Sequence, residues 1–130
     1  MLEFIWTAST GWIAIGMLVG VAALPFVLRW ARILGPARGG AMRWHYALGF
    51  AIAALSFVHA WAPMSTGRLH GINMTGLWLA TTALVLLLVQ LMLGIELREA
   101  RSRVWLRRSH LIVMIAAAGL IAAHVALNRA

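Results

Sequence analysis

The chain has 130 residues, of which 63% are hydrophobic and only 11% are charged. A soluble domain carries about a quarter charged residues, and so short a chain has too little interior to hide this much apolar surface from water. The composition therefore excludes an ordinary soluble domain and favours a membrane protein. Cysteine is absent, which excludes disulfides, thiolate-ligated iron–sulfur clusters and covalent c-type haem attachment.

Four apolar stretches predict four membrane-spanning helices, at about residues 10–28, 44–62, 73–95 and 109–127. About 20 helical residues cross the ~30 Å of hydrocarbon in a bilayer. The spans fill the chain, so we expect one transmembrane domain over residues 1–130, all-α, folded as an integral membrane four-helix bundle. Pro25 near the end of the first span predicts a kink there. Only Glu3 and no basic residue precedes this long span, which favours a true span over a signal peptide.

The net charge of +8 comes from arginine, and its distribution predicts topology. Nine of the 11 Arg lie in the first and third connections, and only Arg68 and Arg129 lie on the other side. The positive-inside rule places the first and third connections in the cytoplasm. Both termini then face the outer, periplasmic side of a bacterial-type inner membrane, in a multi-pass protein. Arginines between apolar runs indicate topology, and we expect no nucleic-acid partner.

Histidines recur at one spacing in two of the predicted spans. His45 and His59 are 14 residues apart in the second span, as are His110 and His124 in the fourth. Fourteen helical residues rise about 21 Å, and at ~3.5 residues per turn both histidines face the same seam. The second and fourth spans run parallel, because two crossings separate them. The pattern therefore predicts facing pairs His45–His110 near the cytoplasmic face and His59–His124 near the outer face.

Two facing imidazoles at each level fit the axial ligation of a b-type haem. Zinc prefers four ligands, and copper would leave the flat space between the helices unused. Ionisable residues inside a membrane are usually functional, although histidines also act as polar contacts between helices. We therefore predict two haem b groups.

Neighbouring residues have two interpretations each. Gly49, Ser56 and Ala117 share the histidine stripes of their spans and leave room for the edges of a macrocycle, or else they serve close helix–helix contact. The arginines Arg43, Arg107 and Arg108 lie within one turn of the inner histidines. They pair with haem propionates or act only as positive-inside markers.

His70 lies in the outer loop, between Met64 and Met74. A solvated histidine is the simplest interpretation, with docking at the outer haem or soft-metal binding as alternatives.

The segments HYALGFAIAALSFVH and HLIVMIAAAGLIAAH resemble the haem signature of the di-haem transmembrane cytochromes b, in particular the ferric-reductase-like membrane domain. The four-helix half of respiratory cytochrome b subunits is similar. The inferred orientation favours the former, because its haem helices run from the cytoplasm outward. The resemblance implies electron transfer between an inner and an outer haem. Ferric reductases usually add a flavin and nicotinamide module, but this sequence has no G-x-G-x-x-G loop.

We therefore expect an electron-transfer component of an oxidoreductase rather than a stand-alone enzyme. Its expected partners are membrane lipid and either one or more oxidoreductase chains or a quinone. One alternative is a quinol- or quinone-reactive haem anchor of a respiratory complex. A second, from a different class, is a haem-free structural membrane subunit.

Overall fold

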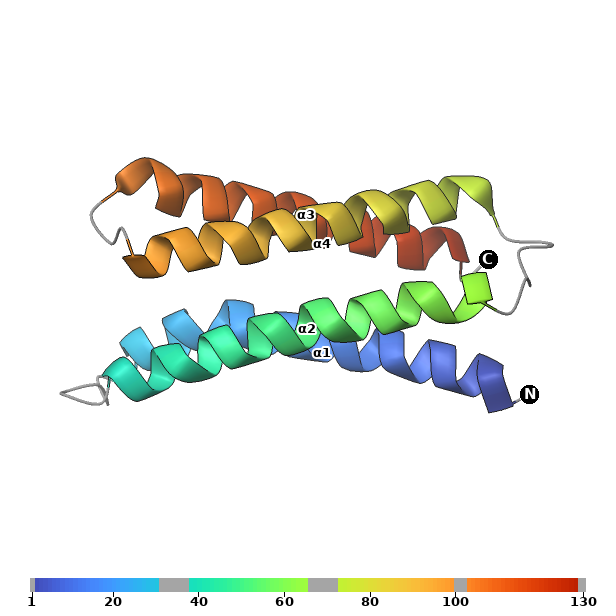
Figure 1. The fold of residues 1–130 in the computed structure, drawn as a ribbon, viewed down its shortest axis with the longest axis horizontal. Coiled ribbons are helices and arrows are strands. Elements are labelled where there is room, and N and C mark those ends of the chain that lie inside the picture. Colours follow the sequence, from blue (N-terminus) through green and yellow to red (C-terminus); the bar gives the residue numbers. More distant parts are fainter. Residues whose placement is uncertain (1, 31–37, 66–72, 100–102, 129–130) are drawn as a thin grey trace. The chain divides into compact units, whose positions relative to one another are not determined.

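The computed structural model describes residues 2–30, 38–65, 73–99 and 103–128. These residues form four helices, namely α1 (Leu2–Trp30), α2 (Arg38–Ser65), α3 (Met74–Glu99) and α4 (Val104–Asn128) (Figure 1). The predicted all-α class is confirmed for these parts of the chain.

The helices are longer than the predicted spans. α1 begins at Leu2, α2 at Arg38 and α4 at Val104, whereas these spans were expected to start at residues 10, 44 and 109. Apolar patterning finds only the part that fits the hydrocarbon, while a helix continues as long as its backbone groups pair within it. The start of α3 was predicted to within one residue. Asn73 caps this helix, because its Oδ1 accepts hydrogen bonds from the backbone N–H groups of Thr75 (3.0 Å) and Gly76 (3.4 Å).

Three described segments are long and apolar enough to cross a membrane: Ser9–Val27, Met74–Glu99 and Val104–Asn128. Large apolar side chains such as Val19, Leu88 and Ile112 are exposed along them. A helical chain with this much apolar surface open to its surroundings is a multi-pass membrane protein. α2 does not meet the same criterion within its described residues, and the span at 44–62 stays a prediction.

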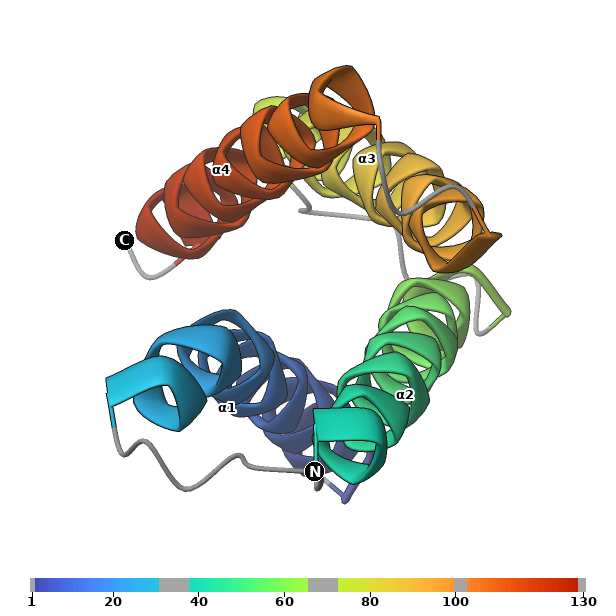
Figure 2. The same ribbon diagram turned by 90° about the vertical axis from the view of Figure 1, so that its left-hand side faces the viewer.

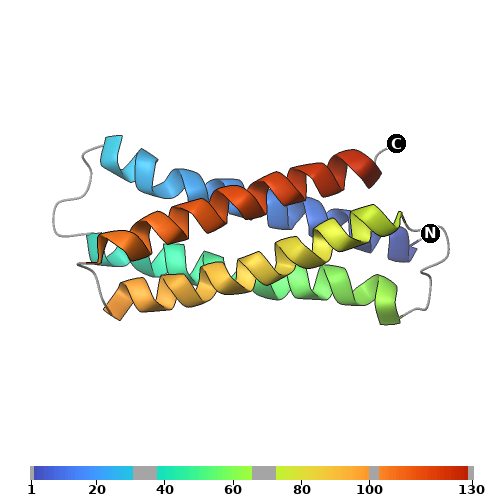
Figure 3. The ribbon, with the colours of Figure 1, turned by 90° about the horizontal axis from the view of Figure 1, so that it is seen from above.

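The chain divides into two compact units, Met1–His59 and Ala60–Ala130. In the first unit, α1 and most of α2 run antiparallel as a helical hairpin (Figures 1 and 2). In the second, α3 and α4 contact each other as an antiparallel pair (Figure 3). Each hairpin therefore has one helix with a histidine pair, α2 or α4, packed against one helix without, α1 or α3. That the hairpins join into one four-helix bundle stays a prediction.

Candidate metal centre

His59, near the end of α2, lies directly on the backbone of α1. Its Nδ1 is 3.3 Å from the hydroxyl oxygen of Thr10. A Cβ atom at Gly11 would lie only 2.9 Å from Cε1 of the ring, so glycine is needed there for the imidazole to come this close. The ring is half-buried, with its Nδ1 side turned toward its own hairpin.

His124, near the end of α4, is held by the beginning of α3. Its Nδ1 lies 2.8 Å from the carbonyl oxygen of Gly76. A carbonyl oxygen only accepts hydrogen bonds, so Nδ1 carries the proton and Nε2 keeps its lone pair. The Asn128 amide nitrogen donates to the backbone carbonyl of His124 (2.7 Å) and lies 3.2 Å from its Nδ1. The contact thus fixes the tautomer in which Nε2 can bind a metal.

His45 lies in the second turn of α2, and its imidazole is half-buried. The ring of Tyr46 meets it edge to face, with centroids 6.1 Å apart.

His110, in the second turn of α4, packs against α3. A Cβ atom at Gly94 would lie 3.6 Å from Cε1 of its ring, an ordinary van der Waals distance. The side chain is half-buried. Three of the four histidines, namely His59, His110 and His124, therefore contact the preceding helix of their own hairpin.

The chain also contains an internal repeat that the spacing of the histidines alone did not reveal. The residues that hold the outer histidines, and the histidines themselves, recur 65 positions later in the chain. The signal was present in the sequence as a Thr-Gly pair at the beginning of the first span of each hairpin and an Arg-x-His motif at the beginning of the second. The matching pairs include Thr10 and Thr75, Gly11 and Gly76, Arg43 and Arg108, His45 and His110, and His59 and His124.

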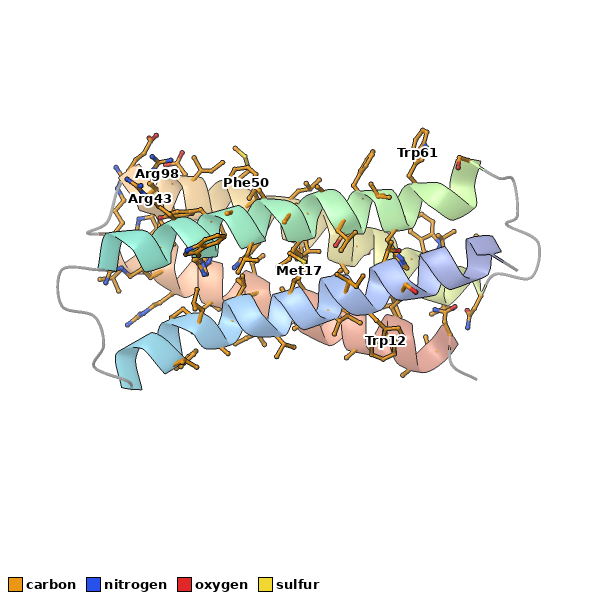
Figure 4. All side chains as sticks on the ribbon, turned by 90° about the horizontal axis from the view of Figure 1, so that it is seen from below. Trp12, Met17, Arg43, Phe50, Trp61 and Arg98 are labelled. Carbon is orange, nitrogen blue, oxygen red and sulfur yellow. The ribbon has the colours of Figure 1, made fainter. Side chains whose placement is uncertain are left out.

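The other predicted site residues are placed as follows. Arg43, Arg107 and Arg108 are exposed, and Figure 4 shows Arg43 and Trp61 at opposite ends of α2. Gly49 and Ser56 are half-buried, and a Cβ atom at Gly49 would meet no heavy atom within 4 Å. Ala117 is only 1% exposed. The residues His70, Arg68 and Arg129 lie outside the described residues.

The donor set of the described residues fits a haem better than a bare metal ion. No group of three or more His, Cys, Asp or Glu side chains comes together within the described ranges, whereas a protein zinc site takes three or four such ligands. A haem iron needs only two axial donors from the protein, because the macrocycle supplies the others. Each described hairpin offers two half-buried imidazoles, and that of His124 has a fixed tautomer.

The fold and these contacts define a multi-pass helical membrane protein built from two similar hairpins. Comparisons with protein-family models, with curated proteins and with solved structures give no match.

Proposed function

We propose that the chain is a di-haem b-type cytochrome that carries electrons across the membrane, as a subunit or partner of a larger oxidoreductase. The observation that carries this proposal is the hydrogen bonding of the outer histidines. In each hairpin the Nδ1 side of that histidine meets an oxygen of the preceding helix, Thr10 for His59 and Gly76 for His124. A metal-ligating histidine almost always donates its second ring N–H to such an oxygen.

The ligand assignment follows from the matched spacing on α2 and α4. His45 and His110 would hold an inner haem, and His59 and His124 an outer one. Such haems would supply one-electron chemistry at iron, and two histidine ligands for each haem would leave no iron position open for catalysis. The work of the protein is then to fix four imidazoles, to keep them half-buried away from water, and to hold two levels about 21 Å apart.

The contacts within the first hairpin support α2 as the fourth membrane span. α2 runs antiparallel to α1 (Figures 1 and 2) and meets it with His59 at Thr10. Thr10 lies at the start of the apolar segment Ser9–Val27 of α1. A helix that runs antiparallel along a membrane span from its end crosses the same layer. The positive-inside rule then places both chain termini on the outer side.

Electrons must reach and leave the chain through partners. The sequence has no dinucleotide-binding glycine motif, so hydride chemistry belongs to another chain or to a quinol. The exposed Arg43, Arg107 and Arg108 sit beside the inner histidines in sequence and are the candidates for pairing with haem propionates.

A pyridine haemochrome assay on protein purified from haem-replete membranes tests the proposal. We expect b-type haem at two per chain. The variant His59→Ala is expected to keep one haem and to stop electron transfer across the membrane in vesicles. Protein that folds and inserts but binds no haem would contradict the proposal and leave a structural subunit.

A further inference from the structure

Gln90 is a polar residue on the face of α3 that packs against α4. On this face Ala83 and Leu87 are only 3% and 8% exposed, and a Cβ atom at Gly94 would lie 3.6 Å from Cε1 of His110. Gln90 continues the series, because steps of four, three and four residues are those of a helix–helix seam. Its side-chain Oε1 is buried, yet no donor within the described parts of the chain bonds to it. A buried acceptor of this kind is destabilising and needs a reason.

The register of the second hairpin places Gln90 at the level of His110. The contact of His124 with Gly76 fixes how α3 and α4 lie side by side at one end. Gln90 lies 14 residues after Gly76, and His110 lies 14 residues before His124. Because the two helices run antiparallel (Figure 3), equal steps from one contact reach the same level. The approach of Gly94, one turn beyond Gln90, to the ring of His110 agrees with this register.

We propose that Gln90 is a positioning residue for the inner haem ligand: its side-chain oxygen accepts the ring N–H of His110 when His110 binds iron. The inference rests on the proposed function. Ligation through Nε2 requires the proton on Nδ1, and hydrocarbon offers this N–H no water as an acceptor. A metal-ligating histidine almost always donates this N–H to an oxygen. The carbonyl of Gly76 accepts from His124 in this way, whereas the acceptor for His110 comes from a side chain and can be removed by substitution.

Gln90→Leu tests the inference in the haem-loaded protein. Without the acceptor, the imidazole of His110 becomes a weaker donor to ferric iron. We expect the oxidised-to-reduced equilibrium of the inner haem to shift about tenfold toward the reduced form, which is ~59 mV for one electron, while the outer haem keeps its potential. The readout is an optical redox titration that resolves both haems. Gln90→Met, which is as long as glutamine, replaces the leucine variant if leucine impairs insertion.

Thr82→Val is the matched control. It also removes a polar group from α3, but the exposed Thr82 donates within its own helix, to the carbonyl of Trp78 at 2.9 Å. We expect both potentials to stay at their wild-type values. Gln90→Glu, which keeps a side-chain oxygen, is expected not to raise the inner potential. An inner potential that is unchanged in Gln90→Leu, as it would be if a backbone carbonyl served His110, overturns the inference.

A second readout needs no haem. In protein prepared without haem, His110 need not keep its proton on Nδ1, and an apolar side chain at position 90 then removes an unsatisfied buried group. We expect Gln90→Leu to lower the equilibrium constant for unfolding in mixed micelles about tenfold. A glutamine that served only to hold α3 against α4 would give a less stable variant instead, which overturns the inference. Wild-type protein without haem overturns the proposed function, whereas normal haem content with an unchanged inner potential overturns the role of Gln90 alone.

Discussion

The four histidines differ in what holds the side of the ring that faces their own hairpin. His124 has a backbone carbonyl at 2.8 Å, which is always available to accept. His59 has a hydroxyl at 3.3 Å, which a single substitution removes. The two outer histidines thus have the same proposed role, but the hydrogen bond of His59 is the weaker of the two. This bond can be tested by changing Thr10, without changing a proposed ligand.

Thr10→Val removes the hydroxyl near Nδ1 of His59 and keeps the side-chain shape. Ligation through Nε2 leaves Nδ1 protonated, so the hydroxyl acts as its acceptor. We expect the outer haem to become easier to reduce, by up to about tenfold in its redox equilibrium, with the inner haem unaffected. Redox titration measures this. Thr10→Ser, which keeps a hydroxyl, serves as the control, and a valine variant that behaves like the serine variant would contradict the role of Thr10.

Gly11→Ala probes the close approach of His59 to α1. A methyl group there would lie 2.9 Å from Cε1 of the ring, so the imidazole must move. Overpacking of this kind costs about 1–3 kcal/mol, and a displaced ligand binds its metal less well. We expect loss of outer haem, measured as the haem-to-protein ratio. At Gly16 a Cβ atom would meet nothing within 4 Å, and Gly16→Ala is expected to keep both haems.

At the scale of the helices, patterning predicted the elements but not their contacts. The four spans, the beginning of α3 and the histidine spacing follow from hydropathy and from the period of a single helix. The partners Thr10, Gly11 and Asn128 do not, because they depend on how one helix is placed along its neighbour. Pro25 was expected to kink the first span. It lies inside α1, which continues to Trp30, and the kink stays a prediction.

The beginning of α3 positions Gly76, and Asn73 fixes that beginning. Asn73→Ala removes an N-cap whose side chain accepts from two backbone N–H groups. We expect the free energy of unfolding to fall by about 1 kcal/mol, measured by unfolding in mixed micelles. Thr81→Val is the comparison, because the Thr81 hydroxyl donates only within its own helix, to the carbonyl of Leu77 at 3.0 Å. An equal loss of stability in both variants would show that the cap has no special role.

At the scale of the whole molecule, the internal repeat explains why the proposed ligands come in matched sets. Corresponding residues of the two hairpins are 65 positions apart. If both helices of each hairpin cross the membrane, as we propose, the two repeats enter it in the same direction, and corresponding histidines would lie at the same depth. One haem at each level would then take one ligand from each hairpin. This step was first predicted from the spacing of the histidines, and the matching Thr-Gly pairs and Arg-x-His motifs add to it.

The pairing of ligands between hairpins predicts a pattern among double variants. If His45 and His110 share one haem, the variant lacking both loses no more than either single variant and keeps the outer haem. The variant lacking His45 and His124 removes one ligand from each level and is expected to lose both haems. Haem-to-protein ratios of the purified variants, together with their remaining redox potentials, measure this. Equal haem content in the two double variants would contradict the pairing, since each removes one histidine from α2 and one from α4.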